Sequence, residues 1–207
     1  MPCYHPLQAW RSKYANENGK FPILFKWKPH ETSEALKVPC GQCRCCRLEY
    51  SRQWALRSVN EAQLYENNEF ITLTYNQENL PQHADLNPDD YTNFMKRFRK
   101  AIHPHKIRYF MCGEYGTQCK WCQRTEKNCQ CGHYTPHLGR PHFHAIIFNY
   151  QFPDRQIWKI QNGETLYRSE QLEKLWPFGF SCTGTVNFKT AAYVARYVVK
   201  KQNGHRS

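Results

Sequence analysis

Long apolar stretches are missing from this 207-residue sequence. Its longest apolar segments are short, such as Ala145 to Phe148. A membrane-spanning helix needs about 20 consecutive apolar residues, so we do not expect a membrane protein. The opening residues MPCYHPLQAW lack a basic segment followed by an apolar one, so a secretory signal is not expected either. No Gly-x4-Gly-Lys-Ser/Thr motif occurs, which excludes a P-loop motor in this sequence.

Acidic residues are scarce compared with basic ones. The chain has 29 Lys and Arg against 17 Asp and Glu, a formal net charge of +12, and 15% of its residues are aromatic. This composition favours a nucleic-acid partner, because phosphates are negative and bases stack on aromatic rings. The other interpretation is a basic surface that only maintains solubility. The aromatic content argues against disorder, and the length suffices for one core, so we expect a single domain over residues 1–207.

The eleven cysteines are an odd number in a chain without an expected secretory signal, which argues against a disulfide framework. Most fall in two clusters, and closely spaced thiols in a reducing compartment are typical of zinc sites. A polar insertion at 117–138 holds the first cluster: Cys119, Cys122, Cys129 and Cys131, followed by His133. A possible second site comprises Cys3, Cys40, Cys43 and Cys46, with Cys45 as a competing ligand. Iron–sulfur ligation stays an alternative, because thiolate spacing alone does not identify the metal.

The periodicity of apolar residues predicts an α+β fold. Helical patterns cover residues 46–65, about 87–102, 169–176 and 190–201. The second helix has Asn87 as its cap and Pro88 in its first turn. Strand patterns cover residues 70–75, 107–112, 142–148 and 180–188, with Gly184 as a possible bulge, and residues 1–45 form an extended arm with one or two short strands. Helices packed on one face of a central antiparallel sheet would bury these patterns.

The strongest local signal is the segment Gly139-Arg140-Pro141-His142-Phe143-His144. Residues i and i+2 of a strand point to the same face, so the two imidazoles project together as a platform for a divalent metal ion. Glu114 closes the preceding predicted strand, and its carboxylate can meet the imidazoles if the two strands are neighbours. Two histidines and one carboxylate leave open positions that suit Mg²⁺ or Mn²⁺ holding a phosphate oxygen. The alternative is two surface histidines and a solvated glutamate.

A pair of tyrosines lies on the last predicted helix. Tyr193 and Tyr197 are four residues apart, so their phenols share one face of the helix. Positive charge nearby comes from Arg196, Lys200 and Lys201. Two aligned phenols beside a metal ion could each attack a phosphodiester and form a covalent phosphotyrosine. The alternative is a tyrosine stripe that packs the helix on the sheet.

Three segments in this order resemble motifs I, II and III of the HUH endonucleases: Phe70 to Tyr75, Gly139 to His144, and Tyr193-x-x-x-Tyr197-x-x-Lys200. Segments 1–6, 39–43, 51–57 and 183–187 resemble the replication initiators of small single-stranded DNA phages, the microviruses, and of gokushoviruses in particular. The resemblance covers nearly the whole chain. The chain departs from this pattern in having residues 117–138 between Gly116 and the second motif, which we interpret as a small zinc-stabilised insertion.

This resemblance implies a central antiparallel sheet of ferredoxin-like or RRM-like (HUH) topology, with helices packed on it and the histidines on a middle strand. It implies a single-stranded DNA endonuclease and ligase that nicks the replication origin and stays joined to the 5′ phosphate through tyrosine. The free 3′ hydroxyl then primes rolling-circle replication. A second tyrosine cleaves the regenerated origin, and the 3′ end closes a circle.

The same resemblance implies roles for individual residues. The ligands of Mg²⁺ or Mn²⁺ would be Glu114, His142 and His144. The first nucleophile would be Tyr197, with Tyr193 as its alternating partner and Lys200 lowering a phenol pKa or holding a phosphate. DNA contacts are expected from Arg140, Arg196 and Lys201.

The resemblance also implies partners, namely single-stranded origin DNA and the helicase and polymerase of the host, in the cytoplasm of a bacterial cell. Two alternatives stay open. A noncatalytic zinc-bearing nucleic-acid module on an RRM-like fold explains the charge, the aromatic residues and the cysteines, but not why the histidines, Glu114 and the tyrosine pair occur together. A relaxase or transposase of the same superfamily would share the chemistry and differ in substrate and partners.

Overall fold

The computed structural model of this chain describes residues 2–81, 85–116, 119, 122, 124, 128–131, 139–161 and 163–201, the last four as backbone only. The chain divides into two compact units, Met1–Ser51 and Arg52–Ser207. The predicted arm at 1–45 falls within the first unit and the predicted insertion at 117–138 within the second. Their membership of one functional domain stays a prediction.

The first unit is built on a three-stranded antiparallel sheet in the order β2-β1-β3. Its strands are β1 (Leu7–Ser12), β2 (Ile23–Leu24) and β3 (Thr32–Val38). Leu7 pairs with Val38 and Ser12 with Thr32, with a bulge between Trp10 and Ser12. We predicted only one or two strands here and found three. Exposed side chains dominate β3, so its sequence shows little of the apolar alternation that identifies a strand.

The second unit contains a six-stranded antiparallel sheet in the order β5-β6-β4-β9-β8-β7. The strands are β4 (Asn68–Tyr75), β5 (Arg108–Tyr115), β6 (Pro141–Phe148), β7 (Gln156–Gln161), β8 (Glu164–Arg168) and β9 (Gly179–Gly184). Strands β5 and β6, predicted as neighbours, pair from Arg108 opposite Phe148 to Tyr115 opposite Pro141. The α+β class and the antiparallel sheet are therefore confirmed.

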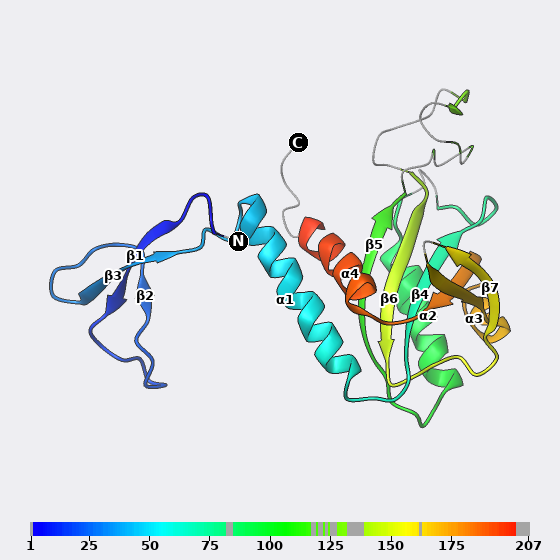
Figure 1. Ribbon diagram of the computed structural model, residues 1–207, viewed down its shortest axis with the longest axis horizontal. Helices are drawn as coiled ribbons and strands as arrows, with labels where there is room; N and C mark the ends of the chain where they lie inside the picture. Colours follow the sequence, from blue (N-terminus) through cyan, green and yellow to red (C-terminus); the bar gives the residue numbers. More distant parts are fainter. Residues whose placement is uncertain are drawn as a thin grey trace. The chain divides into compact units, whose positions relative to one another are not determined.

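Helices cover both faces of this sheet (Figure 1). They are α1 (Arg44–Ala62), which begins in the first unit, α2 (Pro88–Ala101), α3 (Glu170–Leu175) and α4 (Phe188–Lys201). Phe94 and Phe98 of α2 pack with Ile147 in one core, while Val194 of α4 packs with Ile146 in another. The prediction of helices on one face was wrong, because β6 buries apolar side chains on both faces of the sheet. No helix in the described part of the chain is both long and apolar enough to span a membrane.

The predicted cap of α2 is confirmed, whereas the two strands β7 and β8 were not predicted. The Asn87 side chain accepts a hydrogen bond from the Asp89 backbone, and Ser169 caps α3 in the same way. The β7–β8 hairpin escaped prediction because every residue of β7 is exposed. The predicted strand at 180–188 is too long, since β9 ends at Gly184 and α4 begins at Phe188. Gly184 pairs in regular register with Phe70 and is not a bulge.

Candidate functional site

Two neighbouring strands carry three side chains that could hold a metal ion: Glu114 on β5, and His142 and His144 on β6. Glu114 lies directly opposite His142, and the two histidines point to the same face of the sheet. Glu114 Oε1 lies 2.7 Å from His142 Nε2 and 3.1 Å from His144 Nε2. The structure thus brings together the three residues that the sequence predicted as ligands. They are called the metal group below.

The other nitrogen of each imidazole is anchored. His142 Nδ1 lies 3.0 Å from the backbone oxygen of Arg140, and His144 Nδ1 lies 2.9 Å from Thr72 Oγ1. A carbonyl oxygen can only accept, so Nδ1 of His142 carries a proton and, in the neutral ring, Nε2 turns a lone pair toward the Glu114 carboxylate. That arrangement is favourable when a cation lies between the two acceptors or when the ring is doubly protonated. Anchoring through Nδ1 is also how proteins orient histidine ligands.

Burial controls the electrostatics of the metal group. It lowers the pKa of His144, which favours the neutral, metal-binding imidazole. Burial alone raises the pKa of Glu114, but the polar contacts of its Oε1 with both imidazoles and with the Tyr193 hydroxyl outweigh this effect, and the pKa lies far below its usual value. The second carboxylate oxygen, Glu114 Oε2, is buried without a hydrogen-bond partner among the described residues. An ionised carboxylate with an unpaired oxygen beside two imidazoles fits a divalent cation.

Both predicted nucleophiles lie on α4, which packs beside β5 and β6 (Figure 1). The Tyr193 hydroxyl donates a hydrogen bond to Glu114 Oε1, and its ring meets His144 edge-on at a centroid distance of 5.0 Å. Tyr197 follows one turn later, with its ring centroid 5.1 Å from that of Tyr193. Both phenols line a cavity of about 380 Å³ with Glu114 and His142. Burial, reinforced by Glu114, raises the pKa of both phenols, so each keeps its proton at neutral pH.

The predicted basic residues differ in their exposure to solvent: Arg140 is buried and Arg196 is exposed. The Arg140 guanidinium is buried and donates to the backbone oxygen of Tyr75 at 2.9 Å and to Gln77 Oε1 at 2.6 Å. It therefore ties the end of β4 to the start of β6, and its contact with DNA stays a prediction. Arg196 is exposed on α4. The side chains of Lys200 and Lys201 lie outside the described residues.

The N-terminal cysteine cluster assembles within the first unit. Its members are Cys3, Cys40, Cys43 and Cys46. Backbone N–H groups of Cys43 and Cys46 donate to the sulfurs of Cys40 and Cys43, and such bonds, with that of Cys46 foremost, lower the pKa of Cys43 to about 6. A thiolate is the form that binds metal. Cys45 is buried outside this group, so the structure favours Cys46 over Cys45 as the fourth ligand.

The second cysteine cluster lies beside the metal group. Its members are Cys119, Cys122, Cys129 and Cys131. The Cys119 sulfur lies 3.5 Å from that of Cys131, and the Cys122 sulfur 3.6 Å from that of Cys129. None of the described cysteines forms a disulfide, so both clusters could hold zinc. Cys119 also lines the 380 Å³ cavity, so one cysteine side chain forms part of the wall of the candidate active site. His133 lies outside the described residues.

Two contributors to the site carried no assigned role in the sequence analysis. Thr72 anchors His144, and the Phe70 ring stacks on the same imidazole at a centroid distance of 5.5 Å. Both lie on β4, where every second residue points toward the metal group and where Thr72 pairs with His144. The alternation was visible in the sequence, but the pairing of β4 with β6 was not.

Comparisons with known proteins point in one direction. The family model described as replication-associated protein ORF2/G2P matches residues 68–121 and 119–202. Replication-associated protein VP4 of Bdellovibrio phage phiMH2K is 33% identical over 209 residues, which cover 97% of this chain and 58% of the relative. Replication-associated protein ORF2 of Spiroplasma virus 4 is 31% identical over 217 residues, which cover 97% and 61%.

A third relative, replication-associated protein ORF4 of Chlamydia phage 1, is 30% identical over 172 residues, which cover 79% of this chain and 38% of the relative. The chain thus spans at most 61% of the length of these three relatives. No significant match was found among solved structures.

Proposed function

Because the chain belongs to the ORF2/G2P family of replication-associated proteins, we propose that it is the rolling-circle replication initiator of a single-stranded DNA phage. In this proposal it nicks one strand of the replication origin and forms a covalent 5′-phosphotyrosine. One observation carries the proposal. The Tyr193 hydroxyl reaches the same Glu114 oxygen that both imidazoles face, so a nucleophile and a metal group meet at one point.

The same proposal assigns the six-stranded sheet to the HUH type, with its ferredoxin-like or RRM-like topology. Two features support it. The histidines lie on β6, which has β5 and β4 as neighbours, and the tyrosine-bearing helix α4 packs on the face that β6 shares with Cys112 of β5.

The residues of the metal group fit Mg²⁺ or Mn²⁺ through two nitrogens and one carboxylate. Glu114, His142 and His144 would hold the ion, because the anchored Nδ1 atoms leave Nε2 available for coordination. When bound, the ion supplies positive charge that polarises the scissile phosphate and stabilises the charge that develops in the transition state.

Tyr197 is the proposed first nucleophile, because it stands in the Tyr-x-x-Lys spacing of the third motif. Its oxygen forms a bond to phosphorus while the bond from phosphorus to the 3′ oxygen breaks. The phenol gives up its proton during the attack, as its raised pKa requires, and the departing 3′ oxygen takes up a proton. Lys200, three residues after Tyr197, would activate the phenol or hold a phosphate. Tyr193 would then cleave the regenerated origin, and the free 3′ hydroxyl would attack the first adduct to close a circle.

A denaturing gel tests the proposal. The chain is mixed with Mn²⁺ and 3′-labelled single-stranded DNA that carries a randomised window, so the origin sequence need not be known. We expect a labelled band that stays attached to the protein after denaturation. Tight DNA binding without any such band would favour the noncatalytic nucleic-acid module instead. Sequencing the joined DNA would distinguish a phage origin from the target of a relaxase or transposase.

A nick alone neither separates the strands nor extends the 3′ hydroxyl. We therefore propose a host helicase and a host polymerase as partners, acting with single-stranded origin DNA in the cytoplasm of a bacterial cell.

Zinc at both cysteine clusters is proposed as a structural cofactor. We expect elemental analysis of the purified chain to find about two zinc ions per molecule that survive a mild chelator, since closed sites with four thiolates hold zinc tightly. Cys40→Ser and Cys129→Ser should each remove about one of these ions. Cys45→Ser is the matched control, because Cys45 is buried next to the N-terminal cysteine cluster but outside it. Full zinc content in both ligand variants would contradict the assignment.

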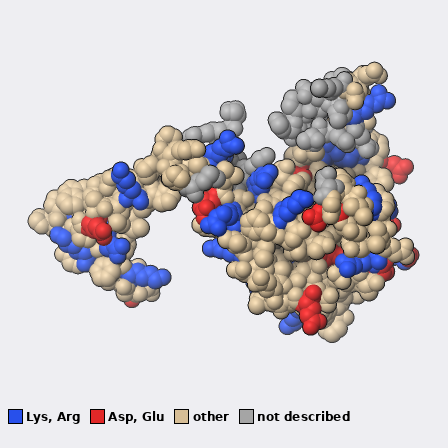
Figure 2. Space-filling model, viewed as in Figure 1, with Lys and Arg blue, Asp and Glu red and all other residues tan. Residues whose placement is uncertain are grey.

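Phosphate contacts should make DNA binding depend steeply on salt. Blue Lys and Arg side chains spread over the visible surface of both units in Figure 2, with red acidic patches between them. We expect affinity for single-stranded DNA to fall about ten-fold or more between 50 and 200 mM salt, because bound counterions are released. Arg196→Gln should flatten the log–log slope by about 0.7 if Arg196 contacts a phosphate.

Lys174→Gln is the matched control for this measurement. Lys174 is exposed on α3 and pairs with Glu170 at 2.7 Å, away from the tyrosine helix. A slope unchanged by Arg196→Gln, measured by titrations at several salt concentrations, would remove Arg196 from the DNA contact.

A further inference from the structure

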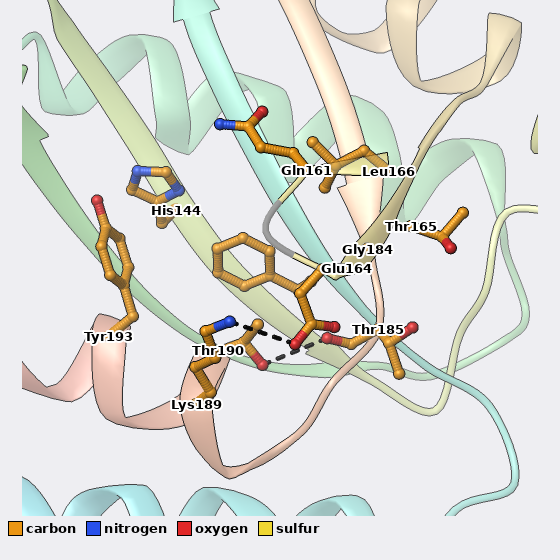
Figure 3. Close-up of a pocket in the computed structure, with 11 residues that line it drawn as sticks. His144, Gln161, Glu164, Thr165, Leu166, Gly184, Thr185, Lys189, Thr190 and Tyr193 are labelled. Atoms are coloured by element: carbon orange, nitrogen blue, oxygen red, sulfur yellow. Dashed lines mark hydrogen bonds and ion pairs between the residues drawn. The ribbon is translucent and has the colours of Figure 1, made fainter. Parts of the chain in front are cut away.

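A second cavity, of about 300 Å³, opens beside the metal group and is used by no step above (Figure 3). We call it the hairpin cavity, because Gln161, Glu164 and Leu166 come from the β7–β8 hairpin. Gly184 of β9 and the following residue, Thr185, also line it. On the side of the metal group it is closed by Phe70, His144 and Tyr193.

The hairpin cavity and the candidate active site share two walls. His144 and Tyr193 line both the 300 Å³ hairpin cavity and the region around the metal group, where Tyr193 also lines the 380 Å³ cavity. In Figure 3 these two side chains stand at one end, Lys189 and Glu164 lie near the middle, and Thr165 lies at the other end. A phosphate held at the metal group is therefore one wall away from this cavity. The nearest group that can enter it is the base of the adjoining nucleotide.

The chemistry of the lining suits a base rather than a phosphate. The Phe70 ring and the Leu166 side chain offer flat and apolar surface, while the Gln161 amide and the Thr185 hydroxyl can donate and accept hydrogen bonds. Lys189 Nζ lies 3.5 Å from Glu164 Oε1, so the one ammonium in the lining faces a carboxylate. Aromatic stacking with a few hydrogen-bonding groups is how proteins hold unpaired bases.

The size of the hairpin cavity agrees. Its volume of about 300 Å³ lies at the lower end of the roughly 300–1,000 Å³ that small-molecule pockets span, which suits a single base and not a base pair. Gly184 keeps this space open. A Cβ built at this position would lie 3.5 Å from Leu166 Cδ2 and 4.0 Å from Phe70 Cδ1, so a larger side chain would occupy the volume between them.

We propose that the hairpin cavity receives the unpaired base of the nucleotide next to the scissile phosphate, and that it sets the sequence preference at that one position. The proposal rests on the proposed function only in taking the scissile phosphate to lie at the metal group. It favours an origin that is single-stranded or locally melted at the nick, because a base in a duplex must first lose its pairing and stacking to enter the cavity.

The first arm of the test uses the 3′-labelled random-window DNA and sequences what becomes joined to the protein. We expect the parent to prefer one base by ten-fold or more at one position beside the nick. Gly184→Leu, which fills the cavity, and Gln161→Leu, which removes its amide, should reduce that preference to less than three-fold while preferences at other positions persist. Joined DNA with the parent preference at every position in both variants would overturn the proposal.

Gln156→Leu is the matched control, because Gln156 is an exposed glutamine on the same strand that does not line the hairpin cavity. Its joined DNA should show the parent preference. A loss of preference in this variant equal to that in Gln161→Leu would attribute the effect to the hairpin as a whole and overturn the assignment to the cavity.

The second arm does not depend on nicking. Backbone amide NMR signals of Gln161, Gly184 and Thr185 are followed while short single-stranded DNA is added without metal. We expect these signals to shift in the parent and to shift several-fold less with an abasic oligonucleotide of the same length. Equal shifts with both would overturn the proposal. Base-dependent shifts without any joined DNA would retain the cavity as a base site and reject the nickase.

Discussion

Tyr193→Phe combined with Tyr197→Phe is expected to reduce the covalent protein–DNA band below detection. Phenylalanine keeps each ring, and therefore the packing of α4 against Ile146, but removes the only oxygen that can bond to phosphorus at these positions. Among the described residues, one further tyrosine, Tyr115, lines the cavity beside the metal group. Its hydroxyl oxygen accepts a hydrogen bond from the Leu86 backbone at 3.1 Å. We therefore do not expect Tyr115 to replace the two tyrosines of α4.

The single variants rank the two phenols. Tyr197→Phe should reduce the first cleavage more than Tyr193→Phe does, since Tyr197 is the proposed first nucleophile and has Lys200 three residues after it. Tyr150→Phe is the control, because Tyr150 packs in the core on the opposite face of the sheet and bonds to Gln171 there. The bands are compared on a denaturing gel with 3′-labelled DNA. A full band from the double variant would place the nucleophile elsewhere.

His142→Ala combined with His144→Ala is expected to lower the nicking rate by about a thousand-fold or more. A bound metal ion contributes several kcal/mol to stabilising transition-state charge, and each 1.4 kcal/mol corresponds to about ten-fold in rate. Without the two imidazoles, Glu114 remains as a single ligand. Glu114→Gln should have an effect in the same direction, because it preserves the size of the side chain and removes its charge.

His103→Ala with His105→Ala is the matched control for the histidine pair. These residues have the same spacing, are exposed and lie outside the metal group. Nicking rates are measured over a Mn²⁺ titration, with circular dichroism to verify that each variant is folded. His144 is buried against Phe70, so the double variant loses some stability, and Glu114→Gln guards against that complication. A rate within three-fold of the parent in both variants would exclude this group as the catalytic metal site.

Local signals predicted the parts of the fold that depend on local structure. Asn87 caps α2 as expected, because a cap is decided by residues within one turn. The β7–β8 hairpin was not predictable from periodicity, since none of β7 is buried. Helices on both faces were not predicted, because only the assembled sheet shows that helices cover the β6 side chains on each face.

The residues of the candidate site also differ in whether local sequence could predict them. The metal group could be predicted because Glu114 lies near the end of one strand and His142 near the start of the next. Antiparallel pairing is the simplest arrangement of two such strands, and it places these residues opposite each other. The role of Thr72 depends on β4 pairing with a strand 72 residues away in sequence, which no local pattern encodes. The inward turn of the Arg140 guanidinium depends on the backbone oxygen of Tyr75, which is equally remote in sequence.

The position of α4 after β9 has a consequence for protein synthesis. A ribosome releases the N-terminal part of a chain first, so the strands that carry Glu114, His142 and His144 emerge before the helix that carries Tyr193 and Tyr197. Under the proposed function, a nascent or prematurely terminated chain could assemble the metal group and the cysteine clusters while it still lacks both proposed nucleophiles. Under the proposed function, cleavage through Tyr197 therefore becomes possible only once translation has passed residue 197, and the template would be protected from incomplete copies of the chain.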